Sequence, residues 1–98
     1  MSREEVLRIL SGNRQKLQEH AVKSLSVFGS VARDEATDAS DIDVLVEFEE
    51  GRPVGLFEFI RLQRFLSEIL GRPVDLATPD ALRPEMRDQI LREAVRAA

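Results

Sequence analysis

Residues 42–48 constrain the fold of this chain most, because two faces of different chemistry alternate along them. The even positions are all apolar, namely Ile42, Val44, Val46 and Phe48. The odd positions from 41 onward are Asp41, Asp43, Leu45 and Glu47. This period of two predicts a strand with one face against a core. Asp41 and Asp43 then share the other face, with Cα atoms about 6.5–7 Å apart at ~3.3 Å per residue.

The remaining pattern predicts an α/β (α+β) chain in the order α, β, short α, β, α, β, α, with a small sheet covered mostly on one side. Ser2 suits the N-cap of a first helix, which Gly12 and Asn13 would interrupt. We further expect a strand at 22–28, a short helix at 31–36, a helix at 54–70 capped by Gly71, and a strand around 74–77. A last helix from Pro84 would bury Met86, Ile90, Leu91, Ala94 and Val95.

Composition narrows the classes of function. The 98 residues fit one domain, 1–98, and include no cysteine and a single histidine, so neither a disulfide nor a zinc site is expected. Oxygen ligands remain, which favours a hard cation such as Mg²⁺. A net charge of -4 argues against nucleic acid as a ligand. Because no run approaches ~20 apolar residues and no signal peptide pattern is present, we expect a cytoplasmic protein without a membrane span.

The aspartate pair is costly to fold, because ionised groups in an apolar run lose water unless a cation or a donor compensates. Metal pairs that catalyse phosphoryl transfer lie about 3.5–4 Å apart, a separation that two such carboxylates can bridge or flank. Asp75 alternates with core residues in another expected strand, and it would add a third carboxylate if the two strands are neighbours. We therefore interpret Asp41, Asp43 and Asp75 as candidate metal ligands. The alternative for the pair is a capped turn.

Gly29 and Ser30 follow the first expected strand and offer phosphate-binding groups. Glycine allows a close approach of the backbone, and the next helix would begin with unpaired N–H groups. Ser30 adds a hydroxyl donor, and Arg33 could reach a phosphate oxygen. A plain turn at Gly29 and Ser30, and a surface ion pair at Arg33, stay open as alternatives. Together with the carboxylates, these groups indicate a site for a Mg²⁺-bound triphosphate.

Four segments resemble the minimal nucleotidyltransferases, a group within the DNA polymerase β-like nucleotidyltransferase superfamily: FGSVAR, SDIDVLVEF, LG-x-PVDL and ALRPEMRDQILREAV. The superfamily signature is a Gly-Ser pair followed at fixed spacing by Asp-x-Asp. The resemblance runs from about Leu25 to Val95 and implies a polymerase β-like fold, with a small mixed sheet flanked by helices. It differs at Asp34, where glycine is frequent in the family.

The resemblance also implies roles for the candidate residues. Gly29 and Ser30 would hold the triphosphate, and Asp41 and Asp43 would bind Mg²⁺. Asp75 would assist the metals or take the proton of the acceptor. The reaction would move a nucleoside monophosphate, with AMP from ATP favoured, onto a hydroxyl group on two Mg²⁺ ions, with release of pyrophosphate.

The acceptor follows from a second implication of the resemblance, since minimal nucleotidyltransferases are often encoded beside a HEPN-domain protein. A chain of this length has no room for an acceptor-binding domain, so we expect an acceptor with its own binding surface. That would be a tyrosine of a HEPN toxin encoded by the adjacent gene, with this chain as antitoxin. Two alternatives stay open: a module that neutralises its partner by binding alone, and a transferase for a small molecule such as an antibiotic, assembled across a homodimer.

Overall fold

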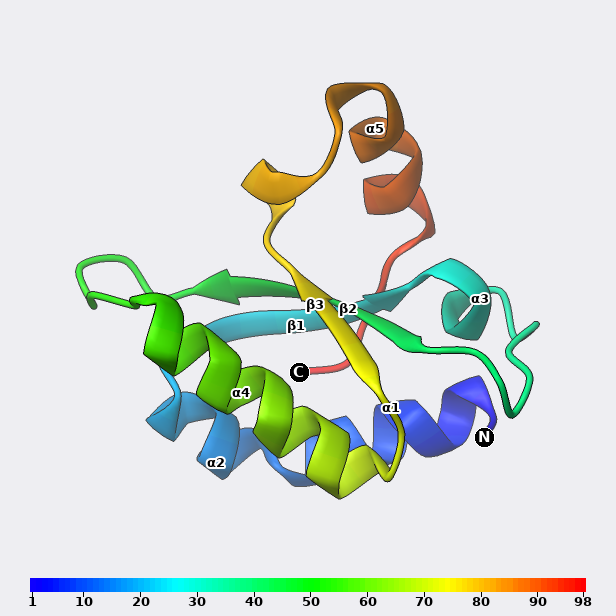
Figure 1. The fold of residues 1–98 in the computed structure, drawn as a ribbon, viewed down its shortest axis with the longest axis horizontal. Helices are drawn as coiled ribbons and strands as arrows, with labels where there is room; N and C mark the ends of the chain where they lie inside the picture. Colours follow the sequence, from blue (N-terminus) through cyan, green and yellow to red (C-terminus); the bar gives the residue numbers. More distant parts are fainter.

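A four-stranded mixed sheet lies at the centre of the computed structural model, which describes all 98 residues (Figure 1). The strands follow the order β3-β2-β1-β4, with bounds Val74–Ala77, Ile42–Phe48, Val22–Phe28 and Val95–Arg96. The two middle strands, β1 and β2, are antiparallel, whereas β3 runs parallel to β2. The expected α/β chain with a small mixed sheet is therefore confirmed.

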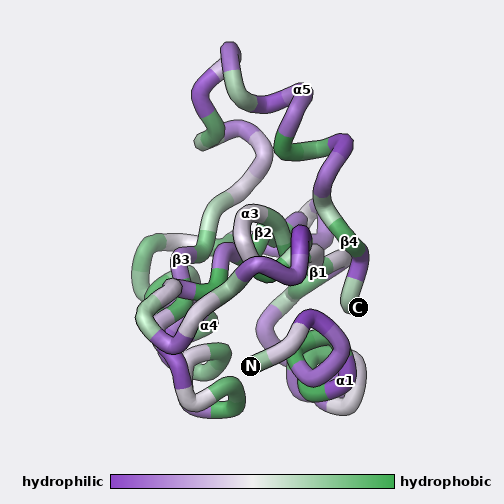
Figure 2. Tube along the Cα trace, turned by 90° about the vertical axis from the view of Figure 1, so that its right-hand side faces the viewer, coloured by the Kyte–Doolittle hydropathy of each residue, from purple (hydrophilic) through white to green (hydrophobic).

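The helices cover the two faces of the sheet unequally. Their bounds are α1 Arg3–Gly12, α2 Arg14–Glu19, α3 Gly29–Ala32, α4 Leu56–Leu70 and α5 Pro84–Glu93, and a 3₁₀ turn, η1, spans Pro79–Ala81. Seen from the side, α1 and α4 lie on one side of the sheet and α5 stands on the other (Figure 2). None of these helices combines the length and the apolar character that crossing a membrane requires.

The core lies between the sheet and the helices α1, α2 and α4. Its members include Val6, Leu10 and Leu17 from α1 and α2, Leu25 and Val27 from β1, Ile42, Val44 and Val46 from β2, Leu62, Leu66 and Leu70 from α4, and Val74 and Leu76 from β3. The even face of β2 thus points into the core, as the alternation predicts. Its odd face carries Asp43 and Leu45 toward the side of α5, and this leaves Asp43 half-buried.

Two expected helix boundaries are confirmed. The first helix ends where Gly12 and Asn13 interrupt the pattern, because the Asn13 side chain donates to the carbonyl of Ile9 at 2.8 Å and closes the last turn. Gly71 adopts a left-handed conformation with φ 66° at the C-terminus of α4. There its N–H donates to the carbonyl of Ser67 at 2.8 Å.

Two other boundaries were predicted wrongly. The short helix covers Gly29–Ala32 instead of 31–36, because Asp34 has a positive φ of 58° and ends the helical run. The last helix ends at Glu93, since Ala94 is extended and residues 95–96 pair with β1 as strand β4. Its predicted buried side is wrong as well. No residue of α5 is buried, and Met86 and Leu91 are 48% and 45% exposed, because α5 stands away from the main core.

Two leucines of α4 test where the core lies. Leu66 is 0% exposed and Leu56 is 72% exposed. We expect Leu66→Ala to lower the free energy of unfolding by about 2–5 kcal/mol through lost burial and a cavity. Leu56→Ala, the matched control on the same helix, should change it by no more than about 0.5 kcal/mol. Urea titration measures the free energy of unfolding of both variants. Equal losses would contradict a core that buries Leu66 and leaves Leu56 exposed.

Candidate functional site

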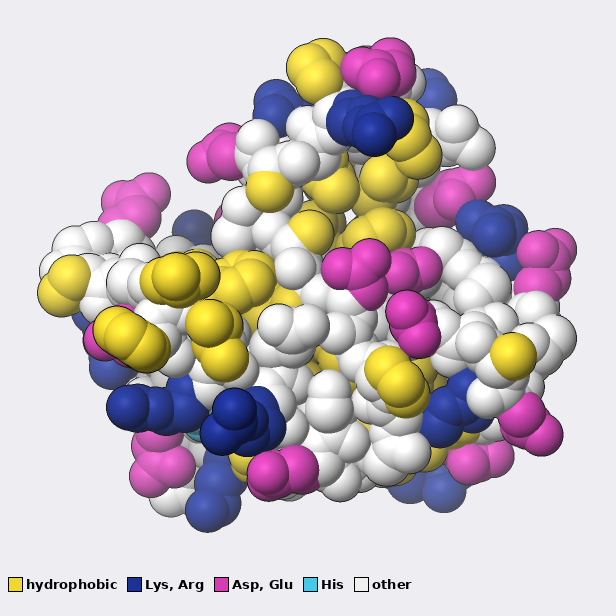
Figure 3. Space-filling view, viewed as in Figure 1, with side chains coloured by type: hydrophobic (Ala, Val, Ile, Leu, Met, Phe, Trp, Pro, Cys, Tyr) yellow, Lys and Arg dark blue, Asp and Glu magenta, His cyan; other side chains and the backbone are white.

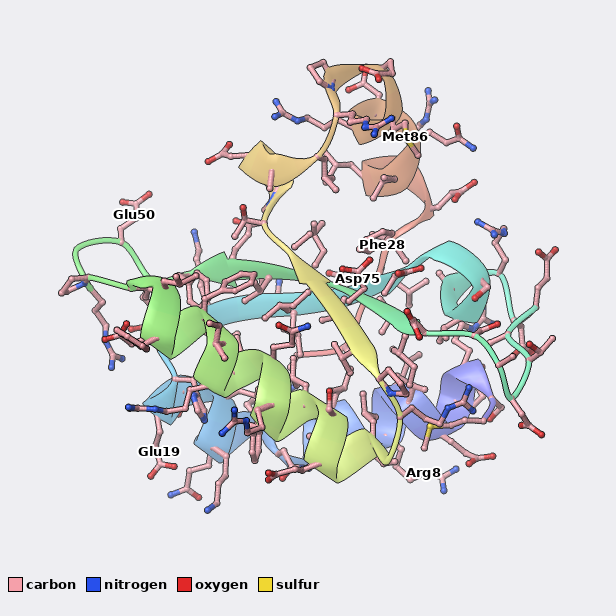
Figure 4. The ribbon with its side chains drawn as sticks, in the orientation of Figure 1. Arg8, Glu19, Phe28, Glu50, Asp75 and Met86 are labelled. Carbon is pink, nitrogen blue, oxygen red and sulfur yellow. The ribbon has the colours of Figure 1, made fainter.

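The parallel pairing of β2 and β3 brings two of the three candidate aspartates together. Asp43 is the register partner of Asp75, so the condition under which Asp75 could join the other two carboxylates, neighbouring strands, is met. On its other side Asp43 is the register partner of Phe28, the last residue of β1. Asp41 lies immediately before β2. Asp75 is labelled in Figure 4, on the part of the sheet that lies below α5.

The three carboxylates form an acidic patch, in which the charge of Asp43 is unfavourable. Acidic side chains gather where β2 and β3 pass below α5 (Figure 3). Asp41 and Asp75 are exposed, whereas Asp43 is half-buried, and burial raises the pKa of Asp43 above its ordinary value. The nearby charges of Asp75 and Asp41 raise that pKa further, and the Arg33 guanidinium opposes them. Ionised Asp43 is therefore destabilised within the folded protein.

The chemistry of this patch suits a hard cation, although its geometry is open. No group of three acidic or histidine side chains lies close enough together to hold a metal ion. The strands that carry Asp43 and Asp75 are neighbours, but the three carboxylates do not form a closed coordination site. The three carboxylates nevertheless supply the oxygen ligands that Mg²⁺ prefers. The raised pKa of Asp43 adds to this, because a nearby cation would relieve the cost of its charge.

Gly29 packs directly against Asp43. Its φ is +68°, and a Cβ at this position would collide with Asp43 Oδ2 and lie 3.1 Å from Asp43 Cγ. Only glycine therefore allows the end of β1 to turn into α3 beside this carboxylate. Ser30 is the next residue, half-buried at the start of α3. The predicted Gly-Ser turn and the Asp-x-Asp pair thus meet in space.

Arg33 lines the same pocket as Gly29 and Asp43. The pocket has a volume of about 220 Å³, and its opposite wall is formed by Met86, Gln89, Ile90 and Glu93 of α5. Arg33 Nε donates to Glu35 at 3.1 Å and Arg33 Nη1 donates to Glu93 at 3.4 Å. The hydrogen bond with Glu35 is the main reason that the pKa of Arg33 lies above its ordinary value. Both ion pairs are exposed, so they add little to stability.

The pocket wall formed by α5 was not predicted from the sequence, because its apolar residues were assigned to the core.

The conformation of Asp34 explains why this chain can have aspartate where glycine is frequent in the family. Its φ of 58° belongs to the left-handed region, which favours glycine and tolerates aspartate. Asp34 Oδ1 also accepts a hydrogen bond from the backbone N–H of Arg3 at 3.2 Å, at the start of α1.

A larger cavity lies elsewhere and lacks this chemistry. Its volume is about 550 Å³, and three basic residues line it together with the last two residues of the chain: Arg14, Lys23 and Arg96. None of the three candidate aspartates is among its lining residues. We therefore take the aspartates and their smaller pocket as the candidate site, because the chemistry of the side chains that line a pocket indicates its function better than its volume does.

Comparisons with known proteins agree on one family. Residues 6–97 match the family described as the nucleotidyltransferase domain. A Methanocaldococcus jannaschii protein, MJ0435, is provisionally named a protein adenylyltransferase and is 48% identical over 79 residues, which cover 81% of this chain and 83% of the relative. Protein adenylyltransferase MntA of Thermococcus cleftensis is 40% identical over 93 residues, or 94% of this chain and 92% of the relative.

Solved structures agree with the family match. One structure, provisionally described as a minimal nucleotidyltransferase, is similar with a TM-score of 0.81 at 40% identity, covering 97% of this chain and 95% of that one. A tri-AMPylated Shewanella oneidensis HEPN toxin in complex with MNT antitoxin gives a TM-score of 0.64 at 17% identity, covering 94% and 71%. At that identity the second comparison shows a common fold only.

The contact between Gly29 and Asp43 can be tested against a second glycine. Gly51 also has a positive φ, +78°, but a Cβ there would meet nothing within 4 Å. We expect Gly51→Ala to cost about 1–2 kcal/mol, the price of the left-handed conformation alone. Gly29→Ala should cost clearly more, because Asp43 must also move. Urea unfolding measures both variants, and equal costs would contradict the packing of Gly29 on Asp43.

The raised pKa of Asp43 predicts a stability difference that depends on pH. Because the folded pKa lies above the unfolded one, ionisation costs more in the folded state, and the penalty is complete only above the folded pKa. Asp43→Asn should therefore stabilise the metal-free protein at pH 7. The gain should shrink as the pH falls through the folded pKa and vanish below the ordinary value of 3.8.

Thermal unfolding in a chelating buffer between pH 7 and pH 3.5 measures this difference. Asp88→Asn is the control, because it removes the same charge from an exposed position of α5. A gain for Asp43→Asn that does not change with pH would argue against the raised pKa.

Proposed function

The chain belongs to the nucleotidyltransferase domain family and, within it, to the minimal nucleotidyltransferases, and we propose that it transfers AMP from ATP to a hydroxyl group of a partner protein. The two relatives named as protein adenylyltransferases support this choice of reaction, since each aligns over more than four fifths of this chain. The observation that carries the proposal is the register of Asp43 with Asp75, with Gly29 packed against Asp43.

Asp41, Asp43 and Asp75 are the residues that would hold the two Mg²⁺ ions that we propose for this reaction. Bound Mg²⁺ would neutralise phosphate charge and orient the α-phosphate for in-line attack. Asp43 lies between Phe28 and Asp75 in the sheet, so the backbone that carries its carboxylate is held on both sides. Asp75 is exposed and can also accept the proton of an approaching hydroxyl group.

Gly29, Ser30 and Arg33 are the residues that would contact the nucleotide. Gly29 keeps the backbone close to Asp43, and the Ser30 hydroxyl is the nearest side-chain donor in sequence to that turn. Arg33 lines the same pocket, where its charge attracts phosphate oxygens. A phosphate would compete with Glu35 and Glu93 for the guanidinium, and the exposure of both ion pairs makes that exchange inexpensive.

The partner that we propose is a HEPN-domain toxin, modified on a tyrosine, with this chain as its antitoxin. The similarity in fold to the MNT antitoxin bound to a HEPN toxin supports it. The exposure of Asp41 and Asp75 fits an acceptor of this size, because a side chain on the surface of another protein can reach them from solvent.

Transfer can be measured with ATP labelled on the α-phosphate, Mg²⁺ and the protein encoded by the adjacent gene. We expect the label on a tyrosine of that protein. The double variant Asp41→Asn with Asp43→Asn should lose more than the roughly 100-fold that removal of an outer-shell partner of a metal ligand costs. Glu49→Gln with Glu50→Gln is the control, because it removes two charges from a loop at the other end of β2 (Figure 4).

Other outcomes would replace the proposal. No transfer by the native chain, together with full neutralisation of the partner by the aspartate double variant, would indicate a module that acts by binding alone. Label on an antibiotic or another small molecule, with the chain alone, would indicate a small-molecule transferase.

Binding of the nucleotide should be visible without turnover. Ligands that bind only the folded state stabilise it, by about 2.7 kcal/mol at 100 times the dissociation constant. We therefore expect Mg²⁺ with a non-hydrolysable ATP analogue to raise the melting temperature of the native chain and not that of the aspartate double variant. The same shift in both proteins would contradict the assigned metal ligands.

A further inference from the structure

Arg72 connects two segments that are far apart in sequence. It lies between the end of α4 and the start of β3, and its side chain is 19% exposed. One guanidinium nitrogen, Nη2, donates to the carbonyls of Thr37 at 3.1 Å and Ser40 at 2.7 Å, and also to that of Asp38. A single arginine therefore contacts three carbonyls of the loop formed by residues 37–40.

This loop leads directly into Asp41. It is closed internally, because the Ser40 hydroxyl accepts from the N–H of Thr37 at 3.0 Å and the N–H of Ser40 donates to the carbonyl of Thr37 at 3.0 Å. Carbonyl groups that point toward one place repel one another, and the guanidinium offsets that repulsion with charge-assisted hydrogen bonds. The side chain of Arg72 thus holds three carbonyl groups of this loop together.

The position of Asp41 depends on this loop more than the position of Asp43 does. Asp43 is paired in the sheet on both sides, with Phe28 and with Asp75. Asp41 precedes the strand and has no partner in either register, since pairing with β3 begins at Ile42. Its place is therefore set by the loop before it and by the bond from the N–H of Ile42 to the carbonyl of Pro73, 3.0 Å long.

We propose that Arg72 is a positioning residue, which fixes the loop carrying Asp41 to the start of the strand carrying Asp75 and so sets the spacing of these two carboxylates. The proposal rests on the proposed function for what the carboxylates bind. The ion pair between Arg72 and Asp38 does not account for the arrangement, because its atoms are 3.9 Å apart and Asp38 is fully exposed. The proposal is based on the hydrogen bonds from Arg72 to the backbone carbonyls of the loop.

The first test concerns the metal-free chain and does not depend on activity. Amide hydrogen exchange at Ser40 and Ile42 should accelerate at least about tenfold in Arg72→Met, because charge-assisted hydrogen bonds to the loop are lost. Arg72→Lys should fall between Arg72→Met and the native chain. Arg52→Met is the control, since Arg52 also donates to a distant carbonyl, that of Gln18 at 3.3 Å. Exchange at the native rate in Arg72→Met would overturn the proposal.

The second test separates positioning from stability. In the transfer assay, Arg72→Met should lower kcat by about 10–100-fold and raise the Mg²⁺ concentration for half-maximal rate, because a displacement near 1 Å can cost that much. The KM for ATP should stay near the native value, since Arg72 is not among the residues assigned to the nucleotide. Arg72→Lys should restore part of kcat, and Arg52→Met should change none of these quantities at a temperature where all variants are folded. An unchanged kcat and Mg²⁺ response would overturn the proposal.

A third measurement uses Mn²⁺ as the probe and stands apart from transfer. Mn²⁺ binding in the presence of a non-hydrolysable ATP analogue, followed by electron paramagnetic resonance, should be about tenfold weaker or more in Arg72→Met, as for the loss of other groups that orient metal ligands. If the native chain labels no acceptor but this difference is found, the proposed function fails and the role of Arg72 stands. Equal affinity for Mn²⁺, or no binding by the native chain, overturns the role of Arg72.

Discussion

The site depends on one constraint, the parallel pairing of β2 with β3. Residues in register on parallel strands point to the same face, so the pairing of Ile42 with Val74 forces Asp43 beside Asp75. The same register places Ile42, Val44 and Val74 in the core on the opposite face. A slip by one residue would bury the carboxylates and expose the core side chains, and that cost keeps the acidic pair in place. The core of this protein therefore also specifies the geometry of its chemistry.

The carboxylates of this region in turn explain three unusual local features of the structure. Asp43 is half-buried beside two other carboxylates, so its charge is unfavourable in the metal-free protein. Gly29 must lie against it with a positive φ, since any Cβ would displace its carboxylate. Asp41 lacks a strand partner and depends on a loop that Arg72 contacts. The charge of Asp43 opposes folding, and the three features together are consistent with a region shaped by binding.

Much of this arrangement could be predicted from sequence, because it rests on local periodicity. The alternation at 42–48 predicted the strand, its buried face and the placement of Asp43 on the other face, whereas Asp41 lies just before the strand. The short strand β4 could not be predicted, since Val95 continues the apolar spacing of a helix and only its pairing with Val27 shows otherwise. The exposure of Met86 escaped prediction for a related reason: periodicity identifies an apolar face but not what covers it. The contacts of Arg72 lie 32–35 residues away in sequence, where no local pattern reaches.

The two halves of the site are held by different means, and this bears on how each can act. Asp43 and Asp75 belong to the paired strands β2 and β3, whose adjacent residues Ile42, Val44 and Val74 are buried in the core, so the spacing of these two residues resists local opening. The opposite wall of the pocket belongs to α5, which has no buried residue. Its ties include the bond from Arg33 to Glu93 and the short strand β4. Few buried contacts mean low local stability, so the wall formed by α5 can change at small cost while the carboxylates stay fixed. The reaction that we propose would need fixed metal ligands and an open path for its acceptor, and this difference in rigidity suits both.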